Sequence, residues 1–379
     1  MEQSNRPARP TRPDAENTEN TENTENTENT ENTENTENTE NTENTENTEN
    51  TENTENTENT ENTENTGNTG NTEHAEHVEH AESAATLLVD CRNALGESAT
   101  WCDATRALYW ADIEGARLWR CRAEDAHGSA ATKTWEMPER LACFALTGDP
   151  DVLLVGLASH LAFFDVRRRT FTRIVDVEPD LPTRLNDGRC DRAGAFVFGM
   201  KDESGGAPRA VGGYYRLNAD LSLQRLALPP VAIANSIAFS PDGSKMYFCD
   251  SPSREIHVCD YRPGGGVDRV RSFARLGDAD GEPDGSTVDA DGGLWNAQWG
   301  GARVVRYDSR GVETDRIAVP TPQPSCVTLD GDGRLYVTSA RVGLGDDALA
   351  SDPHAGGVFV ADTRHAGLPA SRFAYRDSR

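Results

Sequence analysis

The chain has 379 residues and a formal net charge of −27, but these figures average two very different segments. Residues 16–66 repeat Glu-Asn-Thr without interruption, and residues 1–83 carry 23 Asp and Glu against 3 Arg, a net charge of −20. A polar three-residue repeat has no apolar side chains to bury and cannot offset the entropy lost on ordering. We therefore expect residues 1–83 to be a disordered acidic tail and residues 84–379 to be the folded domain.

The rest of the chain carries a net charge of only about −7, which is ordinary for a soluble domain. No Lys/Arg-rich run is present to neutralise phosphates, which argues against a nucleic-acid partner. No apolar run is long enough to span a membrane, and the N-terminus has no apolar signal-peptide core. The eight cysteines are scattered without Cys-x-x-Cys spacing. We therefore expect reduced cysteines in the core, cytoplasmic residence, and a monomer or weak homo-oligomer.

One recurring unit organises the folded part: an apolar strand, a turn with Asp or Gly, and a second apolar strand. Copies lie at residues 103–110, 147–154, 191–198, 241–248, 291–295 and 332–337. The turn glycines, at positions 148, 194, 243, 292 and 333, are 46, 49, 49 and 41 residues apart, which is the period of a propeller blade. Helical periodicity is hardly visible, which argues against an α/β fold. The prediction is an all-β, six-bladed β-propeller with four strands per blade.

Equivalent positions in successive blades lie at equivalent places around the propeller axis. Eight residues before each turn glycine stands a polar residue, and a glutamate occupies the same register in the first blade, which lacks the glycine. The register holds Glu97, Arg140, Asn186, Asn235, Asp284 and Ser325. Because the strand that leads into this turn is the innermost of its blade, we expect six polar side chains around one mouth of the central channel.

A polar ring of this kind predicts a divalent metal ion, since buried carboxylates and amides are costly unless they are paired or bind a cation. The alternative is an internal hydrogen-bond network around buried water. Glu, Asp and Asn offer oxygen ligands, which suit Ca²⁺, Mg²⁺ or Mn²⁺ and are also accepted by Zn²⁺ and Fe²⁺. Three protein ligands would leave coordination positions for water and substrate, as in catalytic metal sites.

Several motifs between residues 88 and 340 resemble the regucalcin (senescence marker protein 30)/gluconolactonase family. They are Gly-Glu-Ser-Ala-Thr-Trp at 96–101, Arg-Leu-Asn-Asp-Gly at 184–188, Asn-Ser-Ile-Ala-Phe-Ser-Pro-Asp-Gly at 235–243, Pro-Asp-Gly at 283–285, and the stretch at 294–307. The segment Trp-Asn-Ala-Gln-Trp-Gly-Gly at 295–301 resembles bacterial arabinono- and galactonolactonases more than the animal proteins.

This resemblance implies a function and a set of site residues. In the family, the positions that match Glu97, Asn235 and Asp284 hold the metal ion. Those that match Arg184 and Asn186 grip the substrate, and an acidic residue further along corresponds to Glu203. The implied activity is metal-dependent hydrolysis of a sugar lactone to the aldonic acid, with L-arabinono-, D-galactono- or D-gluconolactone as the expected substrate.

In such a reaction the metal ion polarises the lactone carbonyl, and we expect Asp284 to act as the general base. The lack of a Gly-x-Ser-x-Gly motif argues against a serine hydrolase. Two rival functions remain: a non-catalytic calcium-binding propeller, and a promiscuous esterase or phosphotriesterase-like hydrolase. Trp295 and Trp299 are candidates either for stacking on a sugar ring or for the core.

Overall fold

The computed structural model describes residues 83–122 and 132–375, and these form six β-sheets. Blade one contains β3 (Gly96–Cys102), β4 (Ala107–Asp112), β5 (Arg117–Arg122) and β6 (Lys133–Glu136). Blade two contains β7 (Leu141–Leu146), β8 (Val152–Leu157), β9 (His160–Asp165) and β10 (Thr170–Asp176). Blade three contains β11 (Thr183–Cys190), β12 (Phe196–Asp202), β13 (Tyr214–Leu217) and β14 (Leu223–Arg225). Apart from Ser83, the predicted acidic tail lies outside the described residues and stays a prediction.

The other three blades complete the ring. Blade four contains β15 (Ala234–Phe239), β16 (Lys245–Asp250), β17 (Glu255–Tyr261) and β18 (Val267–Arg275). Blade five contains β19 (Glu282–Val288), β20 (Leu294–Trp299), β21 (Arg303–Tyr307) and β22 (Glu313–Ala318), and β1 (Ser83–Ala84) pairs with β22 at the edge of this blade. Blade six contains β23 (Pro324–Leu329), β24 (Arg334–Ser339), β25 (Val358–Asp362) and β2 (Thr86–Val89). Outside the blades lie the short 3-10 helix η3 (Ser251–Ser253) and helix α1 (Asp346–Ser351). The predicted six-bladed β-propeller is confirmed.

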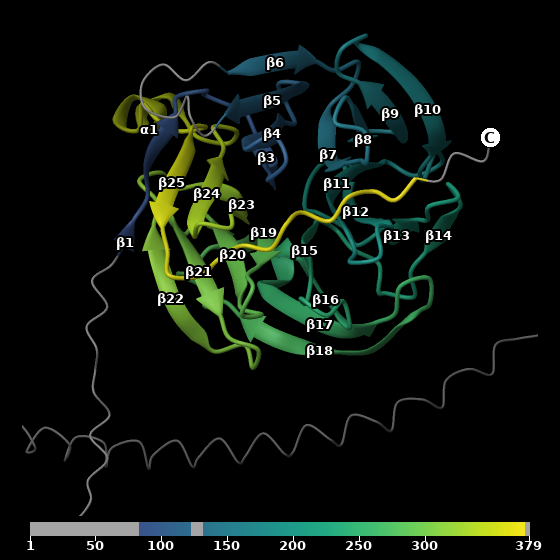
Figure 1. Ribbon diagram of the computed structural model, residues 1–379. Helices are drawn as coiled ribbons and strands as arrows, with labels where there is room; N and C mark the ends of the chain where they lie inside the picture. Colours follow the sequence, from purple (N-terminus) through teal and green to yellow (C-terminus); the bar gives the residue numbers. More distant parts are fainter. Residues whose placement is uncertain (1–82, 123–131, 376–379) are drawn as a thin grey trace, which may run out of the picture. The chain divides into compact units, whose positions relative to one another are not determined.

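The six first strands of the blades (β3, β7, β11, β15, β19 and β23) surround the axis, and each contacts the next around the ring (Figure 1). The sixth blade takes its outer strand from the beginning of the folded part: β2 pairs antiparallel with β25, with Thr86 opposite Val360 and Val89 opposite Val358. The first and last parts of the domain are thus joined in one sheet, which closes the ring.

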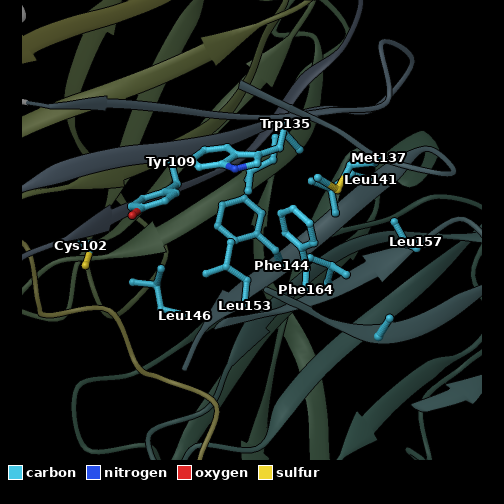
Figure 2. Packing of buried hydrophobic residues seen from close by; sticks show 14 of the residues in the cluster. Cys102, Tyr109, Trp135, Met137, Leu141, Phe144, Leu146, Leu153, Leu157 and Phe164 are labelled. Atoms are coloured by element: carbon cyan, nitrogen blue, oxygen red, sulfur yellow. The ribbon is translucent and has the colours of Figure 1, made fainter. Parts of the chain in front are cut away.

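The apolar core lies between neighbouring blades and not on the axis. Six of the buried clusters each combine side chains of two adjacent blades. Figure 2 shows the cluster between blades one and two, where Trp135 and Tyr109 pack with Phe144, Leu153 and Phe164. Because the blades bury their apolar surface against one another, the inner strands can present polar side chains to the axis.

The recurrent Asp of the blade turns has a structural role in three blades. The Asp that follows the inner strand is buried, and its Oδ1 accepts two backbone N–H groups of the turn, while its Oδ2 accepts a bond from an aromatic side chain. The pairs are Asp191 with Tyr261, Asp289 with Trp295, and Asp330 with Tyr336. Each of these turns is thus held by one buried carboxylate, both oxygens of which accept hydrogen bonds.

The C-terminal segment crosses the end of the channel at which the inner strands finish (Figure 1). The N–H of Gly367 donates to the Asp330 carbonyl at 2.7 Å, and the N–H of Phe373 donates to the Leu146 carbonyl at 2.7 Å. The segment therefore connects blade six to blade two across the axis. It also covers a cavity of about 50 Å³ that is lined by Arg189 and Arg192.

Asp289 carries the strongest test of these turns, because its Oδ2 also accepts a bond from Arg306 Nε at 2.7 Å and both side chains are buried. We expect Arg306→Met to lower the free energy of unfolding by about 3–5 kcal/mol, since a buried carboxylate would lose its charged partner. Urea unfolding of the full chain measures this. The matched control is Arg310→Met, whose side chain is 79% exposed beside Asp308 and should cost less than about 1 kcal/mol. Equal losses in the two variants would contradict the expectation.

Candidate active site at the mouth of the channel

Every inner strand has an irregularity in its pairing at or directly after the predicted ring position. In β3 the register shifts between Glu97 and Thr100, and in β15 between Asn235 and Ala238. The residues after these two, Ser98 and Ser236, have positive φ angles of 56° and 59°. A bulge of this kind bends the strand and re-aims a side chain. The strands that carry Asn186 and Asp284 have the same irregularity at these residues.

Four of the six predicted ring residues line one cavity of about 180 Å³: Glu97, Asn186, Asn235 and Asp284. All four are at least nine-tenths buried. The cavity lies at the end of the channel where the inner strands begin, opposite to the end that the C-terminal segment crosses. The cavity beneath that segment has little room for a sugar ring, and a cavity of about 270 Å³ beside Gly148 contains none of the predicted ring residues. The cavity of about 180 Å³ is therefore the candidate site.

The expectation of six polar side chains around the mouth is wrong for two positions. Ser325 is fully buried, and its hydroxyl donates to the Gly96 carbonyl and contacts the Thr338 hydroxyl. Arg140 precedes β7 and extends to the rim, where it forms two hydrogen bonds with Glu203. A short hydroxyl is satisfied by neighbouring backbone, and a long guanidinium reaches an acid at the surface, so neither lines the cavity.

Burial is the main influence on the two carboxyl groups of the site, and it raises the pKa of both. Burial raises the pKa of Glu97 well above its usual range, and the charge of Asp284 adds to this. Burial likewise raises the pKa of Asp284, with the nearby charge of Asp187 as the next cause. Asp284 Oδ1 is buried and has no hydrogen-bond partner within the described part of the chain. Both observations indicate a place where a cation would be stabilised.

Asn235 is oriented by its neighbours. Its amide nitrogen donates to Ser251 Oγ at 2.8 Å, and Ser251 Oγ in turn donates to the Pro283 carbonyl at 2.8 Å. Its Oδ1 accepts a 3.2 Å bond from Asn186 Nδ2 and keeps one lone pair available. Ser251 therefore couples two of the predicted ligands, Asn235 and the residue that follows Pro283.

These residues fit a divalent cation that prefers oxygen ligands. Glu97 and Asp284 would supply two carboxylates and Asn235 an amide oxygen. No group of three or more His, Cys, Asp or Glu is placed to hold a metal ion in residues 83–122 and 132–375. That finding is consistent with the predicted set, whose third ligand is an amide, and metal ligation by these three residues stays a prediction.

The predicted substrate residues form a chain of contacts behind the cavity wall. Asn186 lines the cavity, and its Oδ1 accepts a 2.7 Å bond from Arg184 Nη1. Arg184 is 1% exposed and lies behind Asn186. Glu203 lies 3.3 Å from Arg184 Nε and also binds Arg140. Arg184 and Glu203 are thus placed to position Asn186, and direct contact of either with substrate stays a prediction.

The structure also adds residues that the sequence interpretation missed. They are Lys201, Ser251 and Glu282, which line the cavity with the predicted residues. Lys201 could have been found in the sequence as a charged residue near the end of the largely apolar strand β12. Of the two tryptophan candidates, Trp299 lines the cavity, whereas Trp295 is 1% exposed in the core between blades five and six.

The glycine of the Pro-Asp-Gly motif is required by close packing. A Cβ on Gly285 would lie 2.6 Å from Cys326 Sγ and 2.9 Å from the Cys326 Cα in the neighbouring inner strand. Only a residue without a side chain lets β19 approach β23 this closely. The motif thus combines a predicted ligand with the packing that brings its blade to the axis.

Comparisons with known proteins agree with this architecture. The model of the SMP-30/Gluconolactonase/LRE-like region family matches residues 95–341. The chain belongs to this family. It is 78% identical over 290 residues to an L-arabinolactonase of Azospirillum brasilense, which covers 76% of this chain and 95% of that protein. It is also 32% identical over 304 residues to a pentonolactonase of Haloferax volcanii, covering 76% and 97% of the two chains.

A solved family structure, the calcium-binding regucalcin of Agrobacterium tumefaciens, superposes with a TM-score of 0.71 at 28% identity. It covers 77% of this chain and 97% of its own. The predicted family and fold are therefore confirmed. All eight cysteines are free, as expected. Within the described residues, no helix is long and apolar enough to cross a membrane.

The raised pKa values of Glu97 and Asp284 predict that metal affinity increases with pH. Protons compete with a cation for these carboxyls, so binding should weaken as the pH falls through the raised pKa values and should release protons. Calorimetric titration of chelator-stripped protein with Mn²⁺ or Ca²⁺ at several pH values, in buffers of different ionisation enthalpy, measures both effects. Affinity independent of pH, with no proton release, would show that these carboxyls are not the ligands.

The Ser251 bridge gives a second prediction. Removing a group that orients a metal ligand typically costs about 10–100-fold in metal affinity, and we expect Ser251→Ala to lie in this range. Ser253→Ala in the same 3-10 helix is the matched control, because its hydroxyl is exposed and bonds only the Asp250 carbonyl and the Glu255 N–H. Unchanged affinity in Ser251→Ala would mean that Asn235 needs no such anchor.

Proposed function

We propose that this chain hydrolyses L-arabinonolactone or a closely related aldonolactone to the aldonic acid, with one divalent cation held by Glu97, Asn235 and Asp284. At the level of class the chain is a sugar lactonase, in line with its family and its lactonase relatives. The proposal adds the substrate, the cation and the residue roles. A small-molecule sugar lactone is the expected partner.

One observation carries the proposal: Asp284 Oδ1 is a buried carboxylate oxygen with no hydrogen-bond partner among the described residues, in a cavity that also presents Glu97, Asn235 and Asn186. Such an oxygen is available to a cation and to a proton. The 78% identity to an L-arabinolactonase suggests the substrate.

The chemistry follows from these residues. When bound, a divalent cation supplies Lewis-acid polarisation of the lactone carbonyl and makes the attacking water more acidic. Asp284 accepts a proton from the attacking water as the water oxygen bonds to the carbonyl carbon. It then donates that proton to the ring oxygen as the ring C–O bond breaks. Asn186, held by Arg184, orients the substrate hydroxyls. Trp299 offers an apolar wall for the face of the sugar ring.

The test is hydrolysis of L-arabinono-, D-galactono- and D-gluconolactone by chelator-stripped protein, with Ca²⁺, Mn²⁺, Zn²⁺, Mg²⁺ or Fe²⁺ restored singly. We expect turnover only with metal, fastest on L-arabinonolactone. Asp284→Asn should lower kcat by about 10²–10⁴-fold, the usual contribution of a general base. Asp291→Asn is the control, since this Asp lies in the turn at the opposite end of the same blade with its side chain 67% exposed.

The outcomes separate the rival functions. Tight metal binding without turnover of any lactone would favour a calcium-binding propeller, the description given to the Agrobacterium tumefaciens relative. Faster turnover of a simple ester or a phosphotriester than of any lactone would favour the promiscuous hydrolase. Full activity in Asp284→Asn would remove this residue from the mechanism.

A further inference from the structure

The chain contains only three lysines, and one of them faces the candidate active site. Lys133 and Lys245 lie on β6 and β16, outside the cavity, whereas Lys201 on β12 lines it together with Glu97 and Asp284. Arginine supplies the other 34 basic residues. A lysine is therefore a rare residue in this chain, and one of the few lysines lines this cavity.

The backbone of Lys201 is fixed between two blades. It pairs with Arg184 in the β11–β12 ladder and forms an antiparallel bridge with Ile233 at the start of blade four. The next residue, Asp202, donates its N–H to the Ala232 carbonyl at 2.8 Å. The side chain thus starts from a rigid position on the cavity wall.

The ammonium group of Lys201 is not paired with any side chain in the described part of the chain. Among the described residues, no carboxylate lies within 4 Å of Lys201 and no side-chain hydrogen bond is made by it. Other basic groups near the site are engaged: Arg140 and Arg184 both bind Glu203. Burial lowers the pKa of Lys201, the positive charge of Arg184 lowers it further, and the charges of Asp284, Glu114 and Glu203 oppose this. The three N–H donors of Lys201 therefore remain available to a ligand in the cavity.

We propose that Lys201 is a catalytic residue whose ammonium donates a hydrogen bond to the lactone carbonyl oxygen and stabilises the negative charge that develops there. This inference rests on the proposed lactonase function. Attack by water forms a bond to the carbonyl carbon and moves an electron pair onto the carbonyl oxygen. When that pair returns, the bond to the ring oxygen breaks. Lys201 keeps its proton throughout, since Asp284 transfers the proton to the ring oxygen.

The same ammonium then faces the product. The carbonyl oxygen becomes an oxygen of the aldonate carboxylate, and the remaining proton of the acid is released to solvent. Lys201 should therefore contribute more to binding the anionic product than to binding the neutral lactone. If Lys201 only offset the charge of Glu97 and Asp284, it would weaken cation binding. Its removal would then leave turnover at saturating metal unchanged.

The experiment compares Lys201→Met and Lys201→Arg with wild type and with Lys245→Met as the matched control, at saturating metal. Loss of one preorganised donor to an oxyanion typically costs about 10²–10³-fold in kcat. We expect a loss of this size in Lys201→Met with a much smaller change in KM, weaker inhibition by L-arabinonate, and partial recovery in Lys201→Arg. Calorimetry should show that cation affinity in Lys201→Met is not reduced, because a nearby positive charge has been removed.

A measurement on the wild-type protein guards against a variant that fails to fold. L-Arabinonate with metal should slow the modification of Lys201 by an amine-reactive reagent, while Lys133 and Lys245 react as before; mass spectrometry resolves the three sites. No protection of Lys201, or unchanged kcat in Lys201→Met while wild type hydrolyses lactone, would overturn the role of Lys201 alone. Absence of lactone turnover in wild type and Lys245→Met would overturn the proposed function together with it.

Discussion

The candidate site can form only in a closed ring of six blades. The predicted ligands come from blades one, four and five, and the residues behind them from blade three, so the site exists only when all the blades occupy their places. Closure is achieved by β2, which joins the last blade through β25. Because each blade buries its apolar surface against its two neighbours, the packing of any blade supports the position of every side chain on the axis.

Packing between blades also explains how the site tolerates its polarity. A single central core would exclude carboxylates, but here the apolar clusters lie between the sheets, and the axis is left to polar groups. Two carboxyls with raised pKa values face one cavity, with Lys201 on its wall. Packing between the surrounding sheets offsets the free-energy cost of burying these charges, and a bound cation would reduce that cost.

Hydrogen bonds behind the cavity wall turn loose side chains into a defined arrangement. Arg184 fixes Asn186, Asn186 donates to Asn235, and Ser251 holds the other end of the Asn235 amide. The first link lies within β11, the second joins β11 to β15, and the third joins β15 to η3, so the chain of bonds spans blades three and four. Preorganisation of this kind is what electrostatic catalysis requires.

The period, the blade number and the register of the inner strands could be predicted from the sequence, because they depend on local patterns of apolar residues and turns. From that register the sequence identified four residues that line the cavity, and the family motifs supplied the family. It did not determine which way each ring residue points: Arg140 and Ser325 share the register but leave the axis, since their bonds go to Glu203 and to the Gly96 carbonyl, which are distant in sequence. Only the tertiary structure placed Lys201 and Ser251 in the cavity, because blade-to-blade contacts join residues whose separation carries no periodic signal.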